Sequence, residues 1–126
     1  RFVTTIEPMH GNNLVIYTGE GQTRLVLDSN LNEGHALAAA DVLGLGYSQI
    51  VAGWRRPDKD GKVGIKLYSK KTTSSNEWES QWIDENGMAC EDLQVMDMNG
   101  DGRLDIVASG RATNNLKIYW NTGRKN

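Results

Sequence analysis

The chain repeats itself, and this repeat constrains its fold more than any other feature of the sequence. When the sequence is shifted by 56 positions, the distance from Asp41 to Asp97, residues 27–55 align with residues 83–111 without a gap. The match includes both aspartates, two glycines after each of them and an Ile-Val-Ala run. A repeat of this kind folds as one supersecondary unit that buries its apolar face against its neighbours. The sequence therefore predicts a stack of similar units.

Each unit has the pattern of several short β-strands. The segments LVIYT, IKLYS and LKIYW begin at Leu14, Ile65 and Leu116, and each alternates with the period of two that is typical of a half-buried strand. A loop with turn chemistry precedes each segment, as at Asp60-Gly61 and Asn114-Asn115, where hairpin turns need positive φ. The expected strands are 2–7, 14–18, 23–28, 36–42, 49–55, 63–69, 77–84, 92–98, 105–111 and 115–120.

Four-stranded units of roughly 50 residues in tandem are the sequence signature of a β-propeller. We therefore predict an all-β fold, a single β-propeller segment over residues 1–126 with about two and a half four-stranded antiparallel blades. Residues 1–30 supply strands two to four of one blade, and residues 35–84 form a complete blade. Residues 91–121 supply strands one to three of a third blade.

A propeller ring needs about four to eight blades, which is more than this sequence contains. We therefore expect the chain to be a segment of a larger propeller, closed by the remainder of a longer chain. The alternative is self-association, in which copies of the chain close the ring together. The strand content argues mildly against that alternative, because the two partial blades overlap in strand content instead of complementing each other.

Charge and hydropathy exclude some classes of partner. The formal net charge is −2, and no Lys/Arg-rich run indicates binding to nucleic acid or to a membrane surface. No apolar run approaches the roughly 20 residues of a membrane-spanning helix. The single cysteine, Cys90, cannot form an internal disulfide, so cysteine usage does not indicate whether the protein resides in an oxidising or a reducing compartment.

The stretch DMNGDGRLD, residues 97–105, has the composition of a calcium loop. Ca²⁺ binds six to eight oxygen atoms, and alternate residues of a tight loop can supply them. The stretch is not an EF-hand, because the twelfth position is Ala108 instead of a glutamate and a strand follows directly. The expected metal ligands are the side chains of Asp97, Asn99, Asp101 and Asp105 and the backbone carbonyl of Arg103.

Residues 97–110, followed by LKIYWNTG, resemble the FG-GAP or VCBS repeat family, the blade type also found in integrin α-subunit heads. The resemblance covers nearly the whole chain, since the first copy of the loop shares the same frame. It implies that the loop joins the first two strands of a blade and holds Ca²⁺. It also implies that ligand sites lie on the opposite rim. A weaker resemblance is to the propeller domains of sugar lyases such as aldos-2-ulose dehydratase.

The aligned loop of the preceding unit, DVLGLGYSQ, departs from this pattern. It keeps Asp41 and both glycines, but Leu43, Leu45 and Gln49 replace the other side-chain ligands. One carboxylate does not hold Ca²⁺ in water, so we expect this loop to bind no metal. Since one unit makes the turn without an ion, the ion at residues 97–105 is expected to be structural and not catalytic.

The rim opposite the calcium loop gathers side chains that can bind or catalyse. His35 and Glu91 are aligned in successive units, and both begin an innermost strand near the expected central channel. With His10 they are candidates for a metal or acid–base centre, because imidazole and carboxylate groups serve both roles. Solvated charges that hold adjacent blades together are the simpler interpretation. The candidate ligand-binding residues on this rim are Arg55, Arg111 and Asp92, of which the two arginines suit a carboxylate or sugar hydroxyls.

Three functions remain open at this point. The first is a calcium-stabilised binding module whose rim holds a carbohydrate or a protein, and the second is part of a sugar-processing lyase or dehydratase. The third is a purely structural segment. No catalytic motif is present, so the non-enzymatic functions are favoured. Single calcium loops of modest affinity suit extracellular or periplasmic spaces, which is the expected location.

Overall fold

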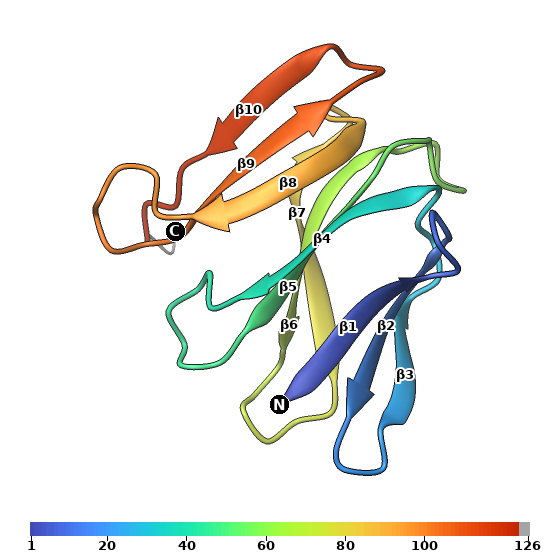
Figure 1. Ribbon diagram of the computed structural model, residues 1–126, viewed down its shortest axis with the longest axis vertical. Coiled ribbons are helices and arrows are strands. Elements are labelled where there is room, and N and C mark those ends of the chain that lie inside the picture. Colours follow the sequence, from blue (N-terminus) through green and yellow to red (C-terminus); the bar gives the residue numbers. More distant parts are fainter. Residues whose placement is uncertain (124–126) are drawn as a thin grey trace.

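The computed structural model describes residues 1–123, which form ten β-strands and no helix (Figure 1). All pairings are antiparallel, and the strands form three sheets in chain order. The all-β prediction is confirmed for these residues. The three sheets do not close into a ring, so the propeller itself is not confirmed. Within residues 1–123 no helix is long and apolar enough to span a membrane.

The sheets hold three, four and three strands. The first contains β1 (Phe2–Glu7), β2 (Asn13–Thr18) and β3 (Thr23–Asp28). The second contains β4 (Gly34–Ala40), β5 (Gln49–Trp54), β6 (Gly64–Lys70) and β7 (Trp78–Glu85). The third contains β8 (Cys90–Met96), β9 (Asp105–Gly110) and β10 (Asn115–Tyr119).

The predicted strands lie where the repeat puts them, with one systematic difference. The strands expected at 36–42 and 92–98 each begin and end two residues earlier, as β4 and β8. Both have a bulge one residue after their start, between Gly34 and Ala36 and between Cys90 and Asp92, which extends the pairing toward the N-terminal side. Both end before an aspartate whose side chain binds its own loop. Because the limits of the strand are displaced by the same two residues in both units, the repeat is present in the structure as well as in the sequence.

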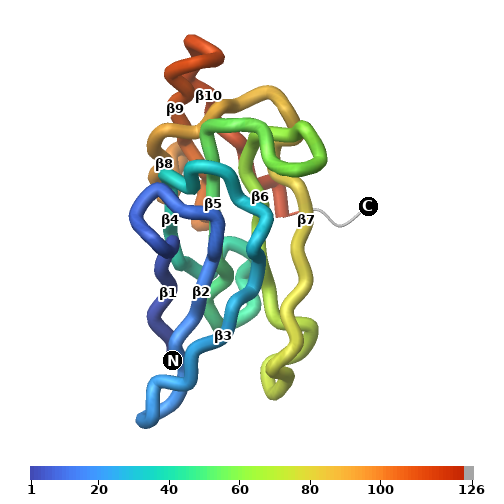
Figure 2. Tube along the Cα trace, turned by 90° about the vertical axis from the view of Figure 1, so that its right-hand side faces the viewer, coloured from blue at the N-terminus to red at the C-terminus, as the bar shows by residue number. Residues whose placement is uncertain are grey.

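The second sheet packs against a neighbouring sheet on each of its two faces, and its inner strands β5 and β6 are the most buried. One face packs against the first sheet, where Trp54 and Tyr68 meet Leu14 and Ile16. The other face packs against the third sheet. The side chains of β5 alternate between these two faces, and because both faces are covered, every residue of β5 is buried. Figure 1 shows the second sheet between the other two, and Figure 2 shows strands of the first two sheets running side by side.

Candidate functional site

The loop between β8 and β9 is organised around Asp97. One carboxylate oxygen accepts a hydrogen bond from Gly100 N–H and the other from Gly102 N–H, each at 2.8 Å. Both glycines have positive φ, 76° and 83°, which glycine adopts without strain. These backbone donors, with Gly102 N–H the strongest, hold the pKa of Asp97 below its ordinary value. The loop therefore presents a charged aspartate at its centre.

The other expected metal ligands lie in the same loop and are also held by backbone groups. Asp105 is 1% exposed and accepts hydrogen bonds from Met98 N–H at 3.0 Å and from Asn121 N–H at 2.8 Å. Asp101 accepts from Arg103 N–H at 2.9 Å. Among residues 1–123 no three His, Cys, Asp or Glu side chains lie close enough to form a metal cluster by themselves. Calcium at this loop therefore stays a prediction.

The aligned loop between β4 and β5 adopts the same turn with fewer carboxylates. Asp41 accepts hydrogen bonds from Leu45 N–H and Gly46 N–H, both at 2.8 Å. Gly44 and Gly46 have φ values of 68° and 84°, close to those of their counterparts. The pKa of Asp41 is lowered by the same kind of backbone donor, Leu45 N–H foremost. The turn is therefore built by one aspartate and two glycines.

In this second loop the side chain of Gln49 occupies the space between the loop oxygens. Its side chain is fully buried, and its amide nitrogen donates to Asp41 Oδ1 at 3.3 Å and to the Tyr47 carbonyl at 2.5 Å. These two acceptors align with Asp97 and the Arg103 carbonyl, both of which are expected metal ligands. The Gln49 amide thus supplies positive hydrogen atoms between two oxygens whose counterparts in loop 97–105 are expected metal ligands.

Asp105 stands where Gln49 stands in the preceding unit, and it has no N–H to donate. Loop 97–105 therefore combines three carboxylates with no internal donor that replaces the Gln49 amide. An oxygen-rich donor set of this kind fits a hard cation such as Ca²⁺. In the sequence alone, Gln49 stands out only as the loss of a ligand. Its position in the repeat was the signal that could have indicated its role.

On the opposite rim, the structure brings His10, His35 and Glu91 together. The two imidazole rings stack with centroids 4.5 Å apart and an interplanar angle of 18°. His35 Nδ1 donates to the Glu91 carbonyl at 2.5 Å, and His35 Nε2 lies 3.6 Å from the Glu91 carboxylate. The three residues come from the first, second and third sheets respectively. The group therefore joins all three sheets.

Arg55 is the second link of this rim. Its guanidinium contacts Glu33 at 2.8 Å and Glu91 at 3.1 Å, so it bridges the second and third sheets. Arg56 reaches the other oxygen of Glu33 at 2.9 Å. Arg55, with Arg56 beside it, holds the pKa of Glu33 below its ordinary value. Arg55 is thus already paired with two carboxylates.

The other two candidate ligand-binding residues, Arg111 and Asp92, do not share one site. Arg111 is exposed, forms no ion pair with residues 1–123, and lines a groove of about 550 Å³ with Glu33, Arg55 and Glu91. Asp92 does not line this groove, and its carboxylate accepts a hydrogen bond from the neighbouring Leu93 N–H. The structure therefore groups Arg111 with Arg55 but not with Asp92.

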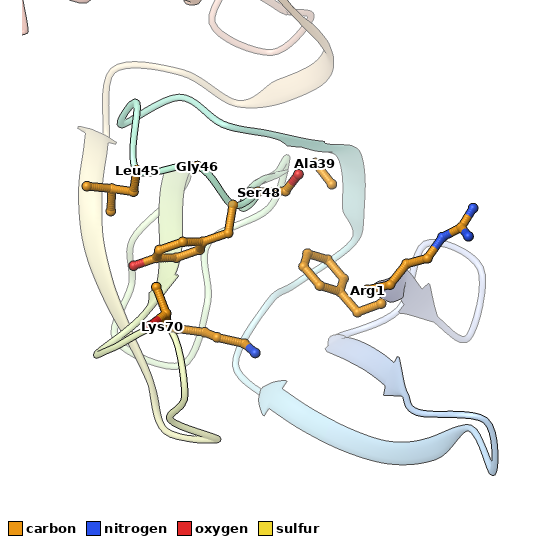
Figure 3. Close-up of a pocket in the computed structure, with 9 residues that line it drawn as sticks. Arg1, Ala39, Leu45, Gly46, Ser48 and Lys70 are labelled. Carbon is orange, nitrogen blue, oxygen red and sulfur yellow. The ribbon is translucent and has the colours of Figure 1, made fainter.

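A further pocket, which the sequence did not indicate, lies between the first two sheets beside loop 41–49 (Figure 3). Its volume is about 540 Å³, and Phe2, Ala39, Tyr47 and Lys70 are among its lining residues. In Figure 3 Lys70 extends toward the space between the sheets, whereas the Arg1 guanidinium points away from it. The pocket was missed because its walls come from strands that are distant in sequence.

Comparison of the chain with protein-family models, with curated proteins and with solved structures finds no match. The function proposed below therefore rests on the residues and on their geometry. Two features carry most weight: the pair of aligned loops, and the rim where the three sheets are joined.

Proposed function

We propose that the chain is a calcium-binding β-propeller repeat module of the FG-GAP or VCBS type. In this proposal the three sheets are consecutive blades, and one Ca²⁺ is held at residues 97–105. The observation that carries it is the exchange of Gln49 for Asp105 at aligned positions, since a buried amide donor is replaced by a carboxylate. Asp97, Asn99, Asp101, Asp105 and the Arg103 carbonyl would hold the ion.

The ion would supply positive charge to a loop that concentrates acidic side chains, and its role would be structural. Support for this role comes from loop 41–49, which makes the same turn with one aspartate, two glycines and the buried Gln49 amide in place of further carboxylates. A chain in an extracellular or periplasmic space would need only modest affinity, with a Kd on the order of 0.1–1 mM. Such a site would be filled at the calcium concentration of those spaces.

The experiment is a calcium titration of the chelator-treated chain, followed by NMR chemical shifts of the loop amides. One site is expected, with shifts confined to residues 97–105 and their neighbours. Asp97→Ala is expected to abolish the response. Asp41→Ala is the matched control, because it removes the aligned aspartate and is expected to leave the response intact. A response that is lost in both variants, or absent from the parent chain, would refute the proposal.

The second part of the proposal concerns the opposite rim, which would bind a carbohydrate or protein ligand. A groove lined by three arginines and two glutamates supports this part. Glycan-array and pull-down measurements test it, with Arg56→Ala as the variant, because Arg56 is the most exposed cation of the pairs on this rim, at 68%. Binding that is unchanged in this variant would place the ligand elsewhere.

The approach of His10, His35 and Glu91 is the observation that favours a second candidate, part of a sugar-processing lyase or dehydratase. A metal or acid–base centre would need a ring nitrogen free to face a substrate. Both nitrogens of His35 instead face Glu91, and Glu91 is also paired with Arg55. These contacts favour a joint between sheets. Titration with Zn²⁺ or Mn²⁺ distinguishes a metal centre from a joint, since a metal centre requires binding that His35→Ala removes.

A further inference from the structure

The outer face of the third sheet, defined by Gln94, Val107, Leu116 and Ile118, exposes apolar side chains beside one amide, and nothing within residues 1–123 covers it. Leu116 is 70% exposed and Ile118 38%. Cross-strand pairing places Gln94, Val107 and Ile118 in one row, because Val107 pairs with both of the others. Leu116 belongs to the next row, opposite Ser109.

Three of the four aligned positions in the second sheet are buried, and the fourth, Ala38, is partly buried. There the corresponding row is Ala38, Val51 and Leu67, and Ile65 corresponds to Leu116. Val51 and Ile65 are 0% exposed and Leu67 is 1% exposed. They are buried because the third sheet packs on them. The outer face of the third sheet therefore repeats a surface that, one unit earlier, is covered by a sheet.

At each boundary between sheets, two residues face each other so closely that one of them is a glycine, because a second side chain would not fit. At the first boundary Gly34 faces Ile6, and a Cβ on that glycine would lie 2.8 Å from the Ile6 side chain. At the second boundary Gly53 faces Cys90, and a Cβ there would lie 2.7 Å from the Cys90 Cβ. Ser109 aligns with Gly53, so a sheet packed on it needs a glycine opposite.

Charge supplies a third requirement. Arg55 reaches across the second boundary to Glu91 at 3.1 Å. Arg111 aligns with Arg55, yet within residues 1–123 it has no carboxylate partner. A sheet covering the outer face would place its own residue at the Glu91 position beside Arg111. A carboxylate at that position would complete the pair.

We propose that the outer face of the third sheet docks one further antiparallel sheet of the same repeat, with a glycine opposite Ser109 and a carboxylate opposite Arg111. This inference rests on the proposed propeller. A second copy of the chain fits less well, because the free face of its first sheet carries Glu7, Tyr17 and Arg24 in a charged network. Burying that network against Leu116 and Ile118 would cost desolvation energy.

The test extends the whole chain after Asn121 by a second copy of residues 71–123. In this copy Cys90→Gly supplies the glycine, as at the aligned Gly34, and the copied Glu91 supplies the carboxylate. Hydroxyl-radical labelling of Leu116 and Ile118 is expected to fall at least about fivefold, and Tm to rise by about 2–4 °C. One matched control keeps cysteine in the copy, and another carries Glu91→Lys there. Both are expected to lose most of the protection.

Three results would overturn the inference. The first is an extended chain whose added sheet forms while Leu116 stays labelled at the original rate. The second is an extended chain whose added residues stay unstructured by circular dichroism. The third is a parent chain that dimerises in sedimentation equilibrium and protects Leu116, since a second copy then occupies the face. Calcium shifts at residues 97–105 in the same chains report separately on the proposed function.

Discussion

Tyr119 donates a hydrogen bond of 2.5 Å to Asp84, and this contact joins the third sheet to the second. The same contact occurs one unit earlier, where Tyr68 donates to Asp28 at 2.7 Å across the first boundary. In each case the tyrosine lies on the third strand of its repeat, and the aspartate on the last strand of the sheet before. Burial, with Asp28 next in importance, raises the pKa of Tyr68 above its ordinary value. The fold therefore repeats a tyrosine–aspartate link at each sheet boundary.

Removal of this link is expected to destabilise the chain. Tyr68 is 2% exposed, so Tyr68→Phe leaves Asp28 Oδ2 without its donor at a boundary where the tyrosine is buried, while Asp28 Oδ1 keeps its hydrogen bond from Asn30 N–H. We expect a loss of about 1–3 kcal/mol in the free energy of unfolding, measured by urea denaturation. Tyr47→Phe is the control, since the Tyr47 hydroxyl has no hydrogen bond with residues 1–123. Equal losses in both variants would show that the hydroxyl of Tyr68 is not what stabilises the boundary.

The exchange between Gln49 and Asp105 predicts a calcium-independent variant. Asp105→Gln introduces an amide where the aligned loop has one, and it removes a carboxylate ligand. Without Ca²⁺ the variant is expected to melt at a higher temperature than the parent chain. The stability of the variant is expected not to respond to 10 mM Ca²⁺. The free energy of unfolding of the parent is expected to rise by about 1.4–2.7 kcal/mol if its Kd is 0.1–1 mM, with a matching rise in Tm. Differential scanning calorimetry measures both values, and a variant that still gains stability from Ca²⁺ contradicts the assignment.

The charged network of the first sheet predicts a dependence on pH. The Tyr17 hydroxyl, then Arg24 and Thr5, lower the pKa of Glu7 from 4.5 to about 2. Because the pKa is depressed in the folded state, Glu7 stabilises the fold fully above pH 4.5. That contribution is lost as the pH falls from 4.5 toward 2. Glu7→Gln is therefore expected to flatten the fall of Tm with acidity in this window. Identical pH profiles for the two chains would exclude the effect.

The rim that joins the sheets predicts a salt-sensitive contribution to stability. Glu91 is 24% exposed and faces both Arg55 and His35, so Glu91→Gln is expected to cost about 0.5–1 kcal/mol by urea denaturation. The cost is expected to shrink in 1 M NaCl, because partly exposed ion pairs are screened. Glu79→Gln, on the exposed part of β7, is the control. A cost that is the same at low and high salt would argue against an ion-pair origin.

The repeat in the sequence determined the strands, their order and the two aligned loops. Alternation and turn residues are local properties, so the positions of β5, β6 and β9 follow from short segments. The loop aspartates were found for the same reason, since Asp97 and its glycines act within one turn. The predicted limits of β4 and β8 were wrong by two residues at each end. At their N-terminal ends the reason is a bulge, which depends on the neighbouring strand as well as on the segment itself.

The tertiary structure alone decided which side chains meet. The sequence aligned Asp28 with Asp84, but only the packed sheets bring Tyr68 and Tyr119 to them. It aligned Arg55 with Arg111, but only packing gives the first a carboxylate on the next sheet. Contacts between sheets join residues that are tens of positions apart, and their distances depend on how two faces fit. Local sequence patterns specify each face, whereas the fit between faces sets the contacts.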